Sequence, residues 1–350
     1  MGVNLFGLSA QEIAEVIAPY GLKAFRGKQI AKGMYQRFLA DFQDMTDLSK
    51  ADRALLSEHF SIDTVTVKAE QHSKDGKTSK YLLAFVGGDC VETVLMRQPY
   101  GNSICISTQV GCAMGCLFCA STLNGLVRNL TVGEILAQVV FMQQQLAVAQ
   151  QKVDTIVVMG SGEPLHNYDH LVQFLKLCHE DYVFHLGYRH ITVSTAGIVP
   201  KIYALAKEQL PVTLSISLHA PTDELRSRLM PVNRRFSLAD LLTAGDAYAM
   251  ETGRRVTYEY ILIAGVNDGE EQARLLAKLM KGKLANVNLI PVNPVVERGL
   301  ARPKAEQMER FAKVLEERHI TVTVRREMGG DIQAACGQLR HQILAGKDVK

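Results

Sequence analysis

The stretch 111-GCAMGCLFCAS-121 brings together three cysteines, Cys112, Cys116 and Cys119, at spacings of four and three residues. Zinc ribbons pair their cysteines two and two, and disulfide frameworks use an even number. Three soft thiolates suit zinc or an iron–sulfur cluster. A cubane cluster held by three cysteines keeps one iron open for a further ligand. The odd number therefore indicates a metal site that reserves one position for another molecule.

On both sides of this stretch, the sequence alternates between short apolar runs and helical patterns. The apolar runs are SICISTQ (103–109), DTIVVMG (154–160), HITVST (190–195), VTLSISLH (212–219), RVTYEYILI (255–263) and NVNLIPVN (286–293), with ITVTVRR (320–326) as a last strand. Alternation of this kind predicts a parallel sheet, and six strands predict an α/β fold built on a partial (β/α)6 barrel. The three cysteines then follow the first barrel strand.

The chain divides into three predicted parts. Residues 1–60 read as a small helical domain, in which Ser9 and Glu12 form a capping box. Residues 61–98 alternate with period two and predict a short antiparallel β extension. Residues 99–350 hold the barrel and a C-terminal segment.

Composition narrows the class of protein. A net charge of +3 over 350 residues means that nucleic-acid binding must come from local basic patches. The N-terminus lacks the features of a signal peptide, and no apolar run is long enough to span a membrane. We therefore expect a cytoplasmic protein without membrane partners, in which the seven cysteines stay reduced. Cys178 shares a helix face with Leu171 and Phe174 and is expected in the core.

Polar residues and glycines recur where the predicted strands end. In parallel β/α folds the loops at the carboxyl ends of the strands carry the chemistry. Besides the cysteines, the residues at these ends are Gly160, Gly162, Glu163, Ser194, Ser217, His219 and Asn293. They predict one polar rim around the thiolates. A zinc site completed by His166 or His219 is the alternative interpretation.

From about residue 90 to residue 340 the chain resembles the RlmN/Cfr family of radical S-adenosylmethionine (SAM) ribosomal-RNA adenine methyltransferases. The motifs that carry the resemblance are STQVGCAMGCLFCAS, RNLTVGEIL, MGSGEPLHN, VSTAGIVP, SISLHAP, LMPVNRR, GVNDG, NLIPVNP and DIQAACGQL. The chain departs from the usual family pattern at Ser161 and at Ala120-Ser121. The helical N-terminal part also fits the accessory domain of the family.

The resemblance implies a radical-SAM barrel with one [4Fe-4S] cluster per chain, held by Cys112, Cys116 and Cys119. It also implies two molecules of SAM consumed per methylation. The residues implied in SAM binding are Gly162, Glu163, Ser194, Ser217, Leu218, His219 and Asn293.

Three further residues are implied in catalysis. Cys336 would accept a methyl group as an S-methylcysteine intermediate, and Cys105 would release the product by forming a transient disulfide with it. Glu92 would take a proton from the base. From the sequence alone, a core thiol is the favoured interpretation of Cys105 and a packing histidine that of His219, and Glu92 could be a solvated strand residue.

The implied product is 2-methyladenosine in the peptidyl-transferase centre of 23S rRNA, and in the anticodon loop of tRNA if tRNA is also a substrate. The family alternative is methylation at C8, and SKDGKTSKYLLAF and IPVNP look more like the C2 branch. An alternative of another class is a zinc-stabilised RNA-binding protein without activity. We also expect a monomer and an electron donor of the flavodoxin or ferredoxin type.

RNA contact requires basic surface, and the segment RSRLMPVNRR offers Arg226, Arg228, Arg234 and Arg235. Their position among the βα loops favours contact with phosphates, although solvated helix faces carry such arginines too. The N-terminal helices are expected to recognise the shape of folded RNA.

Overall fold

One curved sheet of ten strands organises the protein, which a computed structural model describes at residues 2–293, 298–325 and 332. The strand order is β14-β13-β12-β11-β10-β9-β6-β5-β4-β3. Parallel pairing joins β6 (Gly101–Cys105), β9 (Thr155–Val158), β10 (Ile191–Thr195), β11 (Thr213–Ser217), β12 (Val256–Leu262), β13 (Ala285–Pro291) and β14 (Val322–Val324). The predicted α/β fold with a partial barrel is confirmed, and β14 continues it as the predicted last strand.

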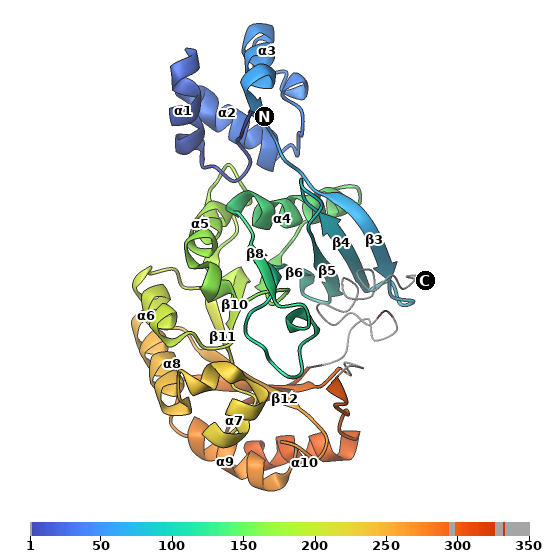
Figure 1. The fold of residues 1–350 in the computed structure, drawn as a ribbon, viewed down its shortest axis with the longest axis vertical. Helices are drawn as coiled ribbons and strands as arrows, with labels where there is room; N and C mark the ends of the chain where they lie inside the picture. The colour runs from blue at the N-terminus through green and yellow to red at the C-terminus, as the bar shows by residue number, and fades with distance from the viewer. Residues whose placement is uncertain (1, 294–297, 326–331, 333–350) are drawn as a thin grey trace.

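Helices cover the outer face of this curved sheet (Figure 1). They are α4 (Val132–Ala147), α5 (Tyr168–His179), α6 (Val199–Lys207), α8 (Leu238–Thr252), α9 (Glu270–Met280) and α10 (Ala305–Glu316), whereas α7 (Asp223–Leu229) lies at the carboxyl ends of the strands. Reciprocal capping boxes start α4 at Thr131 and Glu134, and α8 at Ser237 and Asp240. Apolar side chains of the strands and helices form the main core, and a second, smaller buried cluster contains Cys116, Met230 and Ile263. Within the described residues, no helix is both long and apolar enough to cross a membrane.

Three antiparallel strands extend the parallel sheet directly. They are β3 (Thr66–His72), β4 (Thr78–Ala84) and β5 (Cys90–Gln98), and β5 pairs with β6. Alternate residues of β4 to β6 face opposite sides, since the side-chain period of a strand is two. Tyr81, Leu95 and Ile104 belong to the core. The 61–98 segment and the barrel therefore share one hydrogen-bonded sheet.

The N-terminal part is helical and packs on α4. It contains α1 (Ala10–Ile17), α2 (Phe25–Tyr35) and α3 (Lys50–His59), closed by the parallel pair β1 (Val3–Asn4) and β2 (Phe60–Ser61). The capping box at the start of α1 joins Ser9 and Glu12 as expected. A Cβ atom on Gly7 would collide with the backbone of Gly133, and one on Gly133 would collide with the Phe6 carbonyl. Backbone thus meets backbone where the two parts join.

Candidate active site

A small hairpin that the sequence analysis did not predict carries the three cysteines. Its strands are β7 (Gln109–Gly111) and β8 (Leu126–Asn129), and they pair antiparallel. The loop between them begins at Cys112, whose amide donates to the Gly125 carbonyl at 3.0 Å. Farther along the loop, the Leu117 amide donates to the Leu229 carbonyl of α7 at 2.9 Å. The loop is therefore held both at its base and against the barrel helices.

Two of the three thiols, those of Cys112 and Cys116, lie in a buried environment that opposes their ionisation. Cys112 and Cys116 are buried, Cys119 is half-buried, and no described cysteine forms a disulfide. Burial raises the pKa of Cys112 to about 12, and burial and the neighbouring thiols raise the pKa of Cys116 well above its usual value. Thiolates here need a bound cation, and a metal centre deprotonates its thiol ligands outright. This donor set fits an iron–sulfur cluster.

The described residues hold no group of three His, Cys, Asp or Glu side chains close enough to share one metal ion. A cubane cluster binds each thiolate through a different iron, so its ligands need not converge on one point.

The loop after β9, 160-GSGEP-164, packs against the ends of β6 and β7. A Cβ on Gly160 would lie 2.6 Å from the Ile106 carbonyl oxygen, and one on Gly162 would lie 2.6 Å from Cβ of Gln109. Gly162 also has φ +108°, which favours glycine. We expected these glycines to leave room for a cofactor. In the structure, their missing side chains leave room for Ile106 and Gln109.

Glu163 joins two neighbouring loops of the rim. Its Oε1 accepts the Leu165 amide hydrogen at 3.0 Å, and its Oε2 accepts that of Ala196, just after β10, at 2.6 Å. Burial raises the pKa of Glu163 to about 7, against these hydrogen bonds, which lower it. The charge of Glu163 also acts on Cys112 and Cys116. This carboxyl therefore lies beside the thiols and ionises near neutral pH.

His219 links the end of β11 to β12 and to the cysteine loop. Its Nδ1 accepts the Ile261 amide hydrogen at 3.0 Å, and its ring meets that of Phe118 edge-on, with centroids 4.7 Å apart. Burial lowers the pKa of His219 to about 3, so the imidazole is neutral. These contacts match the packing interpretation, and they also place the ring next to the loop that carries Cys116 and Cys119.

The remaining residues expected at the rim lie at carboxyl ends of parallel strands, or just beyond them. Ser194 is the penultimate residue of β10, Ser217 ends β11, Leu218 follows it, and Asn293 lies two residues after β13. Strand pairing places Ser194 beside Ser215, two residues before Ser217.

Arg226 corrects our expectation of a phosphate contact. Its side chain is wholly buried, and its guanidinium donates to the carbonyls of Ala196, Ser217 and Leu218 at 2.7–3.1 Å. It also donates to Asn233 Oδ1 at 2.9 Å. Arg226 therefore fastens the ends of β10 and β11 to α7 and is closed to RNA, whereas Arg228 on the same helix is exposed.

Two expected catalytic residues, Glu92 of the extension and Cys105 of the barrel, lie on the sheet face opposite α4. Thr93 donates to Gln138 of α4, so Glu92, its neighbour in β5, faces the other way. Glu92 is buried and pairs with Lys80 Nζ at 3.2 Å, so the solvated-residue interpretation was wrong. Cys105 is buried at the end of β6, opposite Val94. Cys336 lies outside the described residues.

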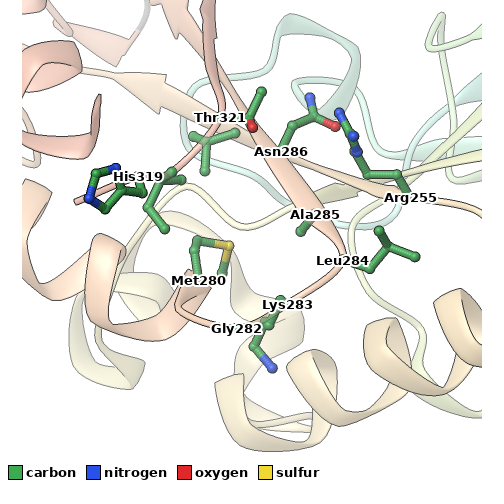
Figure 2. A pocket seen from close by; sticks show the side chains of 11 residues that line it. Arg255, Met280, Gly282, Lys283, Leu284, Ala285, Asn286, His319 and Thr321 are labelled. Carbon is green, nitrogen blue, oxygen red and sulfur yellow. The ribbon is translucent and has the colours of Figure 1, made fainter. Parts of the chain in front are cut away.

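A pocket at the amino ends of the barrel strands, opposite the carboxyl ends that form the rim, is separate from this site. Figure 2 shows it between the amino ends of β12 and β13 and the segment before β14. Arg255, Met280 and His319 help to line it, and Lys283 points away, toward its partner Asp246 on α8. Polar residues at the amino ends of barrel strands serve stability more than chemistry.

Two family profiles match the chain. The Radical SAM superfamily profile matches residues 106–277, which include the cysteine loop. The profile of the ribosomal RNA large subunit methyltransferase N-terminal domain matches residues 3–62.

Individual relatives match nearly the whole chain. A "Probable dual-specificity RNA methyltransferase RlmN" of Symbiobacterium thermophilum is 54% identical over 96% of this chain and 91% of its own length. Its namesake from Bacillus licheniformis is 50% identical over 96% and 93%. A crystal structure of a radical SAM methyltransferase from Sphaerobacter thermophilus superposes with a TM-score of 0.93 and 44% identity, covering 96% of this chain and 98% of the other.

Proposed function

Because this chain belongs to the RlmN family of radical SAM RNA methyltransferases, we propose that it methylates an adenine of 23S rRNA and of tRNA at carbon 2. The observation that supports this most directly is the three-cysteine loop at the carboxyl edge of a parallel barrel, with Glu163 beside it. An aromatic C2 carbon is electron-poor, so ordinary transfer from a sulfonium fails and radical chemistry is required.

The cofactors are a [4Fe-4S] cluster and SAM, which together supply a carbon radical when bound. Cys112, Cys116 and Cys119 would hold the cluster. Glu163, ionised above pH 7, would attract the SAM ammonium group, a charge-assisted contact stronger than a neutral one. The other residues proposed to contact SAM lie along the same rim: Gly162, Ser194, Ser217, Leu218, His219 and Asn293.

Three residues of the chain would carry out the later steps of methyl transfer. Cys336 would carry the methyl group to the base and become joined to it. Glu92 would take the ring proton, and the Cys105 thiolate would then attack the Cys336 sulfur, so that a disulfide forms and the methylated base leaves. A reductant must then reopen that disulfide.

We favour C2 over C8 because the full-length relatives are RlmN proteins, whose name describes dual-specificity RNA methyltransferases. That name also supports tRNA as a second substrate. The zinc-stabilised RNA-binding protein of the sequence analysis does not fit a chain that belongs to a family of methyltransferases.

The proposal extends to partners and location. We propose a monomer that works in the cytoplasm with a flavodoxin- or ferredoxin-type electron donor. Exposed arginines such as Arg228 would contact RNA phosphates, and the N-terminal helices would recognise folded RNA.

Mass spectrometry of adenosines tests the function. RNA from cells that lack their own enzyme should gain 2-methyladenosine when they express this chain, and none when they express Cys116→Ala. Iron and labile sulfide in the purified protein should accompany the activity. Zinc without iron, or 8-methyladenosine in place of 2-methyladenosine, would contradict the proposal.

A further inference from the structure

Two opposite charges are buried together in the antiparallel part of the sheet. Lys80 Nζ lies 3.2 Å from Glu92 Oε2, and the side chains are 0% and 4% exposed. Either charge alone would be very costly in this environment. Burying such a pair seldom stabilises a protein more than apolar residues of the same volume would. We therefore look for a functional reason for the buried Lys80–Glu92 pair.

Strand register places this pair beside the proposed resolving thiol. Lys80 of β4 pairs with Val94 of β5, and Val94 pairs with Cys105 of β6. Directly paired residues share a face, so Lys80, Val94 and Cys105 form one row across three strands. Glu92, two residues before Val94, lies on the same face and reaches Lys80 diagonally.

A chain of hydrogen bonds connects the backbone of Glu92 to the rim of the barrel. The Ser107 hydroxyl donates to the Glu92 carbonyl at 2.9 Å and accepts the Ser161 amide hydrogen at 2.9 Å. Ser161 lies in the loop that also carries Glu163. The backbone at Glu92 is thus fixed relative to the loop after β9, and Lys80 pairs with the side chain.

We infer that Lys80 is the positioning residue that holds the Glu92 carboxylate in the orientation in which it can take the proton from the RNA base. The inference rests on the proposed function. In this step the ring C–H bond breaks, its electron pair stays with the ring, and the proton moves to Glu92. The ammonium of Lys80 itself touches no substrate and transfers nothing.

A comparison of Lys80→Met, Glu92→Gln and the double variant tests this inference. Both single variants should retain the cluster, the formation of 5′-deoxyadenosine and the methylation of Cys336. Both should form methylated adenosine about 100-fold more slowly, which is within the range for loss of a general base, and both should accumulate RNA joined to the protein. The double variant should be no slower than either single one, since the two residues act as one unit.

Two further variants separate positioning from packing. Lys80→Arg keeps the charge and should recover part of the rate, while Lys68→Met, at an exposed lysine of the neighbouring β3, should leave it unchanged. If the single variants fold poorly, the double variant should have the higher thermal midpoint, because no charge remains buried without its partner.

The outcomes are distinct. Losses that multiply in the double variant, a normal rate for Lys80→Met, or a double variant no more stable than poorly folded single ones would overturn the role of Lys80. A wild-type protein that cleaves no SAM and methylates no adenosine would instead overturn the proposed function.

Discussion

The carboxylate of Glu163 accepts the amide hydrogen of Ala196 at 2.6 Å, which ties the loop after β9 to the loop after β10. Arg226 holds the same residue from the other side, through the Ala196 carbonyl at 2.7 Å. A carboxylate and a guanidinium therefore set the shape of the rim beside the cysteines.

Replacing one cysteine of the loop should remove the cluster and spare the fold. Cys116→Ala should abolish the iron–sulfur absorbance and all SAM cleavage, while far-UV circular dichroism stays that of the wild type, because the main core lies elsewhere. Cys178→Ala is the matched control in that core, and it should keep its iron and lose about 1 kcal/mol of unfolding free energy. SAM cleavage by Cys116→Ala would rule out the cluster ligation.

SAM affinity should rise as the pH increases through about 7. The pKa of Glu163 is raised to about 7, so its carboxyl is neutral below that pH and attracts an ammonium group only above it. Calorimetry on the cluster-loaded protein between pH 6 and 8 should show weaker binding and a flatter pH profile for Glu163→Gln. Equal affinity and equal pH dependence for the two proteins would remove Glu163 from the SAM site.

Arg226 and Arg228 should behave oppositely although they lie on one helix. Arg226→Met should cost at least about 4 kcal/mol of unfolding free energy, because four buried acceptors lose their donor at about 1–3 kcal/mol each. Arg228→Ala should change that energy by less than about 0.5 kcal/mol and should weaken RNA binding at low salt. Denaturant titrations and filter binding at several salt concentrations measure both. RNA binding lost in a folded Arg226→Met protein would restore the phosphate assignment.

His219 should make the fold sensitive to acid. Its folded pKa of about 3 lies below its ordinary value of 6.5, so its contribution to stability is complete above pH 6.5 and is lost as the pH falls toward 3. Asparagine tolerates the positive φ of this position, and His219→Asn removes the titration. Urea unfolding of the cluster-free protein should depend less on pH in the variant over that interval. Parallel curves for the two proteins would contradict this account.

Cys105→Ala should trap the reaction after the base has joined the protein. The methyl carrier remains, but no thiol can attack the Cys336 sulfur, so denaturing gels should show RNA-bearing protein that ribonuclease trims. Cys336→Ala and the double variant should show none, because the carrier acts before the resolving thiol. Free methylated RNA formed at the normal rate by Cys105→Ala would make Cys105 a core thiol.

Sequence periodicity was sufficient for the barrel, because each parallel strand is a short apolar run between helical patterns. Spacing was likewise sufficient to single out the cysteine loop. The β7–β8 hairpin was missed, since strands of three and four residues give too little alternation. Two features of the site depend on tertiary contacts and could not be predicted from local sequence. Nothing local in DELRSRL shows that Arg226 turns inward to carbonyls as distant as Ala196, and the Lys80–Glu92 pair depends on the register between two strands.

The contact between Gly7 and Gly133 has a consequence for how this family can vary. Neither position admits a side chain without moving a backbone, so main chain fixes how closely the N-terminal part approaches α4. Most exposed side chains of those helices lie away from this contact, so they can change without altering it. The outer surface of the N-terminal part can thus vary while its spacing from the barrel stays constant.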